Sequence, residues 1–233
     1  MRGLRKYLTP FAPDQSGAVS VLYELGGIIV ICDAGGCTGN VCGFDEPRWF
    51  ERKSAVFSAG LRDMDAILGR DDRLVAKLVD AADKIDANLA AIVGTPVPAV
   101  IGTDYQALKR MCEKKTDLPI LAIDTDGMEL YDKGEEKAYL ALFTAFAKEK
   151  YEVCKEKVGI LGMTPQDVSD LKAADKVREE LKKEGKEAIC YGMGDGLEAV
   201  ERASEVGKNI VVSAAALEAA KYLEKTFGTP YEI

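Results

Sequence analysis

The hydrophobic positions of this 233-residue chain follow two alternating patterns. Short apolar runs predict buried strands, and stretches with apolar residues three or four positions apart predict helices. Strands are predicted at Ile28–Cys32, Leu89–Gly94, Pro119–Ile123, Val158–Leu161, Ala188–Tyr191 and Asn209–Ser213, with a possible short strand at Asp65–Leu68. Helices are predicted at Ala18–Leu25, from Asp71 or Asp72 to Ile85, and at Pro98–Lys115, Glu135–Glu152, Thr164–Glu184, Leu197–Val206 and Ala214–Phe227.

The alternation of strand and helix along most of the chain predicts parallel sheets that are covered by helices on both faces. We therefore expect an α/β protein with tandem Rossmann-like parallel sheets flanked by helices. The stretch 148–157 is strongly charged and marks the break between two units. The predicted domains are residues 1–155, which carry the cysteine loop, and residues 156–233, which show about three strands and look incomplete.

Composition narrows the class of protein. Apolar residues make up 47% of the chain, and no apolar run approaches the ~18 residues of a membrane span. The net charge of −8 argues against a nucleic-acid partner, and the N-terminus lacks a signal-peptide pattern, so a cytoplasmic location is expected. The six cysteines are then free thiols or metal ligands. There is no histidine, which excludes Ser–His–Asp and Cys–His catalysis.

The first predicted strand leads into a loop that contains the most distinctive residues of the chain. Cys32, Cys37 and Cys42 are spaced four residues apart, and glycines stand at positions 35, 36, 39 and 43. Ligands of open parallel sheets gather beyond the carboxyl ends of strands, so the loop is a candidate site. Thiolates hold iron–sulfur clusters, and backbone at Gly36 could approach one closely. The alternative for Cys32 is that it packs as a small apolar side chain at the end of a buried strand.

Three other segments have a functional and a structural interpretation. Asp45, Glu46 and Arg48 could contact an anionic substrate or a partner, or they could form a turn in which Trp49 packs on the core. Residues 124–127 (Asp-Thr-Asp-Gly) resemble a phosphatase motif of the haloacid-dehalogenase type, but a turn satisfied by its own Asp side chains is favoured. Residues 192–196 (Gly-Met-Gly-Asp-Gly) could hold an anion, but a plain tight turn is favoured.

The order of motifs along the chain resembles the nitrogenase component 1 family. Ile31–Cys37 stands where that family has its His-Gly-Pro-x-Gly-Cys signature, and Gly36-Cys37 matches the end of it. The blocks Thr95–Asp104, Ile123–Phe146 and Val158–Pro165 are similar to later family blocks. Leu223–Tyr231 resembles the family's Phe-Gly-x-Pro-Tyr/Phe element. The cysteine expected near Pro96 is missing, and Cys32 replaces the signature histidine.

The resemblance implies a nitrogenase component 1-like oxidoreductase subunit. Such a subunit takes electrons from an ATP-dependent iron-protein reductase and binds an iron–sulfur cluster, expected here as [4Fe–4S]. Cys37 is the cluster-ligand position that survives, with Cys32 and Cys42 as further candidate ligands. The incomplete cysteine set implies a cluster shared with another nitrogenase-like subunit, in a homo- or hetero-oligomer. Two alternatives stay open: a non-catalytic scaffold or carrier for a metallocluster or tetrapyrrole, and a cluster-free protein that binds a small anion.

Overall fold

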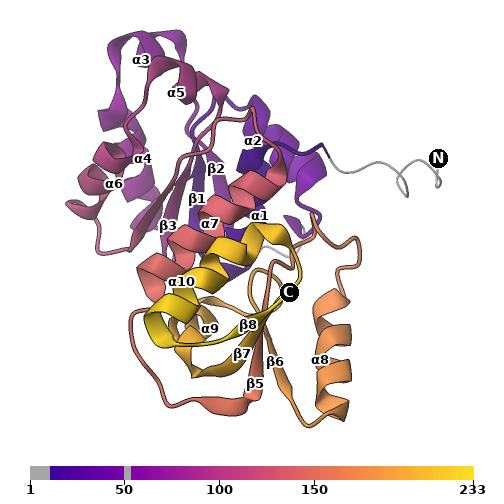
Figure 1. The fold of residues 1–233 in the computed structure, drawn as a ribbon. Coiled ribbons are helices and arrows are strands. Elements are labelled where there is room, and N and C mark those ends of the chain that lie inside the picture. The colour runs from indigo at the N-terminus through magenta and orange to yellow at the C-terminus, as the bar shows by residue number, and fades with distance from the viewer. Residues whose placement is uncertain (1–10, 50–53) are drawn as a thin grey trace, which may run out of the picture.

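The computed structural model describes residues 11–49 and 54–233 (Figure 1). The helices are α1 (Asp14–Leu22), α2 (Gly36–Asn40), α3 (Asp63–Leu68), α4 (Asp71–Ala82), α5 (Pro96–Ile101), α6 (Tyr105–Glu113), α7 (Tyr131–Phe146), α8 (Ala173–Lys183), α9 (Leu197–Glu201) and α10 (Leu217–Phe227). The strands are β1 (Ile28–Ile31), β2 (Ala55–Ser58), β3 (Ala90–Val93), β4 (Ile120–Ile123), β5 (Cys154–Leu161), β6 (Glu187–Cys190), β7 (Val206–Val211) and β8 (Tyr231–Glu232). None of the helices in these ranges is long and apolar enough to cross a membrane.

The strands form two parallel four-stranded sheets, which confirms the predicted α/β class with tandem sheets. The first sheet has the order β2-β1-β3-β4 and the second has the order β6-β5-β7-β8. In both sheets the first strand of the unit is central, with the second strand on one side and the third on the other. Each sheet therefore has a topological switch point between its first and third strands, where ligands of doubly wound folds collect.

Two predicted elements are wrong because local caps override the apolar pattern. Residues 65–68 are not a strand but part of helix α3, which a left-handed Gly69 (φ 62°) ends. Residues 98–115 are not one helix but the two helices α5 and α6. Gly102 (φ 72°) ends the first, and the Asp104 carboxylate caps the second by accepting the Ala107 amide at 2.9 Å.

Other boundaries differ where side chains or sheet pairing take over. The helix expected from Thr164 begins only at Ala173, because the Thr164 hydroxyl is used in a buried contact with Glu135. Helix α1 begins at Asp14, α7 spans Tyr131–Phe146, and α9 ends at Glu201 before β7 begins. Two strands were missed: β2 lies in a segment with little apolar patterning, and the two-residue β8 gives the second sheet its fourth strand.

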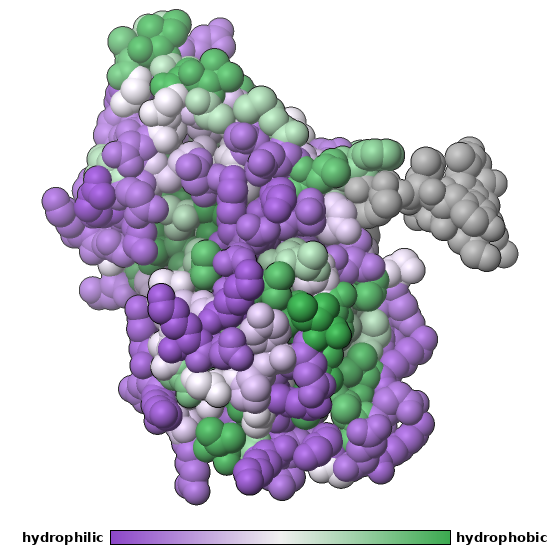
Figure 2. Space-filling model, in the orientation of Figure 1, coloured by the Kyte–Doolittle hydropathy of each residue, from purple (hydrophilic) through white to green (hydrophobic). Residues whose placement is uncertain are grey.

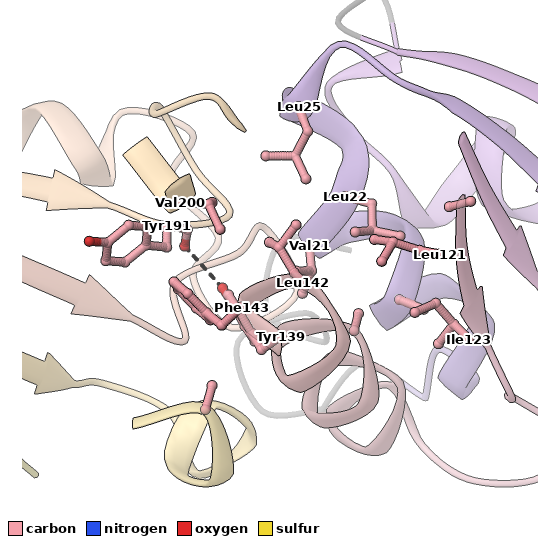
Figure 3. Packing of buried hydrophobic residues seen from close by; sticks show 14 of the residues in the cluster. Val21, Leu22, Leu25, Leu121, Ile123, Tyr139, Leu142, Phe143, Tyr191 and Val200 are labelled. Atoms are coloured by element: carbon pink, nitrogen blue, oxygen red, sulfur yellow. Dashed lines mark hydrogen bonds between the residues drawn. The ribbon is translucent and has the colours of Figure 1, made fainter. Parts of the chain in front are cut away.

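One hydrophobic core joins the two units. Helices α1 and α7 lie between the sheets, and the core cluster draws residues from both units (Figure 1). Figure 3 shows Val21 and Leu22 of α1 facing Leu142 of α7, while Phe143 meets Tyr191 edge to face at 5.1 Å. The Tyr139 hydroxyl donates to the Tyr191 carbonyl at 3.0 Å, so the α7 helix is bonded to the second unit.

Two glycines allow α1 and α7 to pack in backbone contact. A Cβ atom on Gly134 would lie 1.7 Å from the Asp14 carbonyl oxygen, and a Cβ atom on Gly17 would lie 1.9 Å from the Tyr131 carbonyl oxygen. These distances are far below any tolerated contact, so glycine is required at both positions. The close approach places the start of α7, with Glu135 one residue after Gly134, against the second unit.

Glu135 is a fully buried acid on α7. The Thr164 hydroxyl donates to Oε1 of Glu135 at 2.6 Å, while Oε2 faces no donor among the described residues. Burial and the neighbouring Asp167 carboxylate raise the pKa of Glu135 to about 9, and burial also raises the pKa of Asp167. Glu135 therefore keeps its proton in the folded protein at neutral pH, close to the Asp167 carboxylate of the second unit.

We predict that Glu135→Gln stabilises the protein increasingly as pH rises. The unfolded glutamate titrates near 4.5 and the folded one near 9, so between these values the folded state holds one proton more than the unfolded state. Stability of the wild type then falls with pH by about 1.4 kcal/mol per unit at most, and Gln removes this dependence. Urea unfolding at several pH values between 5 and 9 tests it. A stability difference that does not change with pH would contradict the buried neutral acid.

Candidate functional site

The candidate site lies at the switch point of the first sheet, between the carboxyl ends of β1 and β3. Cys32 and Asp33 follow β1, and Thr95 follows β3. The buried Thr95 hydroxyl donates to the Cys32 carbonyl at 2.6 Å and so ties the two strand ends together. The cysteine loop leaves the sheet at this tie, in the place where the doubly wound topology predicts a site.

Asp33 holds the loop in position. Its carboxylate is 2% exposed and accepts the Thr38 amide at 2.7 Å, the Thr38 hydroxyl at 2.9 Å and the Ser58 hydroxyl at 2.6 Å. Three donors thus satisfy the oxygens of this buried carboxylate. Asp33 therefore fixes α2, which carries Cys37, against the end of β2. Sequence reasoning did not single out this residue, although an acid directly after a buried strand is a signal that could have found it.

Cys37 is half-buried in α2, directly after the loop turns at Gly35 (φ 117°). Burial, and then the charge of Asp33, raise the pKa of the Cys37 thiol. A Cβ atom on Gly36 would meet no atom within 4 Å, so packing within this chain does not require glycine there. The Cys37 side chain packs at the edge of the main core and stays partly exposed, with open space beside the neighbouring Gly36.

The three loop cysteines do not come together as a ligand set. Cys32 is 1% exposed and belongs to the core on the other side of the first sheet, with Tyr105 and Cys112. Burial, and then Asp33, raise the pKa of Cys32 to about 12. Cys42 is half-buried in a π-helical turn, and burial and Glu46 raise its pKa. Across residues 11–49 and 54–233, no group of three Cys, Asp or Glu side chains is arranged to hold a metal ion.

The other cysteines lie away from this loop. Cys112 and Cys190 are buried in core clusters, as expected for packing residues. Cys154 is half-buried at the start of β5, and its thiol donates to Glu156 at 3.4 Å, so it packs less than expected.

Arg48 is a buried guanidinium that joins three parts of the chain. It is 2% exposed and donates to both Glu46 oxygens at 2.7 Å, to Glu24 Oε1 at 2.9 Å and to the Ser20 carbonyl at 2.6 Å. It also donates to the Gly192 carbonyl of the second unit at 2.9 Å. Burial alone lowers the pKa of Arg48, but the bonds and charges of Glu46 and Glu24 outweigh it and raise that pKa.

The neighbours of Arg48 are also bonded internally. Glu46 is 3% exposed, and Asp45 accepts the Ser16 hydroxyl at 2.8 Å and the Asn40 amide at 2.6 Å, while its carbonyl accepts from Gln166. Trp49 packs against the main core. The sequence analysis left two roles open for Asp45, Glu46 and Arg48: a structural turn, or contact with a substrate or partner. The contacts in the structure are those of the structural role.

The two other motifs are turns whose donors are satisfied within the chain. Asp126 accepts the Met128 amide at 2.8 Å, which confirms a turn satisfied by its own Asp side chain, and Asp14 accepts the Asp126 and Gly127 amides. In the glycine loop at 192–196, the Gly194 amide donates to Glu24 Oε2 at 2.7 Å. The anion held by this loop is therefore a carboxylate of the chain itself. Sequence reasoning missed Glu24, because nothing local marks its distant partners.

The first sheet is doubly wound and has a cysteine loop at its switch point, and a second parallel sheet with the equivalent strand order follows it. This arrangement defines a class of proteins with tandem Rossmann-like units. The chain belongs to the nitrogenase component 1 type oxidoreductase family, which matches residues 15–233. This confirms the resemblance stated from the motifs.

Individual relatives are distant and longer. The nitrogenase iron-molybdenum cofactor biosynthesis protein NifE of Clostridium pasteurianum is 25% identical over 181 residues, which cover 75% of this chain and 38% of that protein. The structures of nitrogenase Cp1 at pH 6.5 and at pH 5 each superpose with a TM-score of 0.78 and 18% identity, over 96% of this chain and 45% and 47% of theirs. The chain therefore spans less than half the length of these relatives.

Replacing Arg48 with alanine is predicted to destabilise the protein strongly. The change leaves the buried Glu46 and the part-buried Glu24 without their cationic partner, which costs about 3–5 kcal/mol. Urea unfolding measures this cost. The matched control is Arg70→Ala, since the Arg70–Asp72 pair lies at the surface and its loss should change stability little. Equal effects of the two substitutions would show that the buried cluster does not hold the loop.

Thiol labelling should separate the loop cysteines. We predict that iodoacetamide at about pH 8 modifies Cys37, Cys42 and Cys154 in the folded protein, because these thiols are partly exposed. Cys32, Cys112 and Cys190 are buried and should react only after unfolding in urea. Peptide mass spectrometry reports each site. Labelling of Cys32 as fast as Cys37 in the folded protein would contradict its placement in the core.

Proposed function

We propose that this chain is an oxidoreductase subunit that presents Cys37 to an iron–sulfur cluster shared with a second nitrogenase-like subunit. Electrons from an ATP-dependent iron-protein reductase pass through this cluster to a substrate. The observation that carries the proposal is the position of Cys37, a partly exposed thiol at the switch point of the first sheet. Family membership supports the oxidoreductase class.

The described residues fit one cluster ligand better than a complete set. Iron–sulfur clusters are usually held by four thiolates. Cys32 is sealed in the core, whereas Cys37 and Cys42 are both partly exposed. This chain offers Cys37 first, because Gly36-Cys37 stands at the end of the family signature, and Cys42 second. The remaining ligands must then come from a partner, which makes a homo- or hetero-oligomer a requirement of the proposal. When bound, the cluster supplies one-electron redox chemistry at this edge.

The residues of this chain have supporting roles toward such a cofactor. Asp33 holds α2, and therefore Cys37, in one orientation. The Thr95 hydroxyl ties the ends of β1 and β3 together where the loop begins. Gly36 leaves room for close approach.

An exposed apolar surface at the same edge of the sheet as the cysteine loop supports the need for a partner. Helices α3 and α5 follow β2 and β3 and lie at the same edge of the sheet as the cysteine loop. Figure 2 shows hydrophobic residues gathered at the end of the molecule where these helices lie. Ile67 is 73% exposed and Val100 is 82% exposed. The other exposed members are Met64, Leu68, Val97 and Ile101. Patches of this kind mark protein–protein contacts.

A second candidate function is a non-catalytic scaffold that receives and releases a metallocluster. The likeness to NifE, which its name assigns to cofactor biosynthesis, favours it. A scaffold and an electron-transfer subunit differ in turnover: a scaffold passes cargo to an acceptor without a steady electron flux from a reductase.

Anaerobic reconstitution with iron and sulfide tests the shared site, with a second copy of this chain as the partner at hand. The wild type should bind iron and sulfide and develop visible charge-transfer absorption. Cys37→Ala should bind iron at least about tenfold more weakly, the size of effect that even loss of a supporting residue causes.

Cys154→Ala is the matched control, since Cys154 is another partly exposed cysteine at the start of β5. It should retain the iron content of the wild type. Equal iron in the wild type and Cys37→Ala, or none in either, contradicts the proposal.

A further inference from the structure

The free edge of β4 borders a groove that the proposed cluster site does not use. Within the described residues, β4 is the last strand of the first sheet and pairs only with β3. A cavity of ≈620 Å³ runs along it, with Leu121, Ala122 and Ile123 of β4 in its floor. Helix α6 contributes Lys109 to one wall, and α7 contributes Leu140, Ala141 and Thr144 to the other. The groove is therefore walled by one helix on each side of a strand edge.

The backbone at this edge is available for pairing. The Pro119 and Ile123 carbonyls accept the Ala90 and Gly94 amides at 2.9 and 3.1 Å, so those groups face β3. Successive residues of a parallel strand direct their backbone groups to opposite sides. The N–H and C=O groups of Ile120 and Ala122 therefore point away from β3, and no strand in the described part of the chain pairs with them. Ile120 is 2% exposed, so the accessible groups are those of Ala122, which lines the groove. They form a template for an added strand.

The topology leaves a strand position open at this place. Doubly wound sheets of order 2-1-3-4-5 place a fifth strand beside the fourth. Here the segment after β4 forms α7, which runs toward the second unit and leads into β5 of the other sheet (Figure 1). Helices α6 and α7 both contact β4, as flanking helices of a five-stranded sheet would. The groove thus lies where the fifth strand of such a sheet would be.

The charges around the groove select an acidic occupant. Lys109, Lys137 and Lys148 line it together with a single acid, Asp124. Lys137 donates to the outward Asp124 carbonyl at 2.6 Å and lies 3.7 Å from Glu129, Lys109 lies 3.8 Å from Glu113, and Lys148 forms no ion pair with the described residues. The two ion pairs are long and partly exposed, so a carboxylate of an incoming segment can replace Glu113 or Glu129. The chain as a whole carries a net charge of −8 and therefore repels acidic segments. The lysines around the groove are a local exception to this repulsion. Lysines on an edge also discourage unselective pairing.

We propose that an extended acidic segment of a partner protein binds the β4 edge as a fifth strand. Its backbone pairs with Ala122, the partly exposed residue of the edge, and its carboxylates meet Lys109 and Lys148. This surface is separate from the cluster site, so the inference stands whether or not Cys37 binds iron.

The probe is a blocked synthetic peptide of alternating valine and glutamate, with a second peptide that has lysine in place of glutamate. NMR of the ¹⁵N-labelled protein should show the acidic peptide shifting and protecting the Ala122 amide. The lysine peptide should bind at least tenfold more weakly. Failure of the acidic peptide to bind, equal binding of both, or shifts confined to another surface would overturn the proposal.

Two variants locate the interaction. Ala122→Pro removes an outward N–H at an edge position, where proline is tolerated, and should weaken binding at least tenfold while urea unfolding checks the fold. Lys109→Glu with Lys148→Glu should weaken it by a similar factor. The matched control, Lys182→Glu with Lys183→Glu on α8, changes the net charge equally in the second unit and should keep the affinity. Equal losses in both double variants would reduce the effect to net charge and overturn the β4 site.

Discussion

The buried guanidinium of Arg48 is the interaction on which the arrangement of the candidate site depends. Its donors reach Glu46 in its own turn, Glu24 and Ser20 beside α1, and Gly192 in the second unit. The cysteine loop contains little regular secondary structure: α2 has five residues, and a π-helical turn follows it. Such a segment gains its fixed position from the contacts at its two ends: Asp33 anchors the beginning, and Arg48 anchors the end.

The switch points of the two sheets differ in what occupies them. In the second sheet, Thr164 and Asp167 follow β5 and Ser213 follows β7, and Asp167 hydrogen bonds with both side chains. Glu135 of α7 closes this cluster from the first unit. The second switch point is thus filled by side chains of the chain itself. The first switch point has the half-exposed Cys37 and a neighbouring apolar surface, so it is the one left for a cofactor and a partner.

Much of the fold could be predicted from the sequence, because buried parallel strands appear as apolar runs that stand out from amphipathic helices. The face of the sheet on which Cys32 lies could also be predicted from the sequence. Side chains alternate along a strand, so Val30 and Cys32 lie on one face, and Ile29 and Ile31 lie on the other. A buried role for Glu135 had a signal too, because Ala138, Tyr139 and Leu142 share its helix face. Caps such as Asp104 were missed where apolar spacing suggested one continuous helix.

The contacts that position the site could not be predicted in the same way. Arg48 and Glu24 are 24 positions apart, and Arg48 and Gly192 are 144 apart, so no local pattern pairs them. The divergence of the three loop cysteines has a related cause. Equal spacing in sequence does not bring side chains together when one ends a strand, one starts a short helix and one lies in a π-helical turn.

The most direct test of the central claim is anomalous X-ray diffraction at the iron edge, from crystals of the reconstituted protein. The account predicts an iron peak beside the Cys37 sulfur, at the carboxyl end of β1 and at a contact with a second subunit. Iron bound only elsewhere, such as beside Cys154, or iron enclosed by Cys32 within the core, would contradict it.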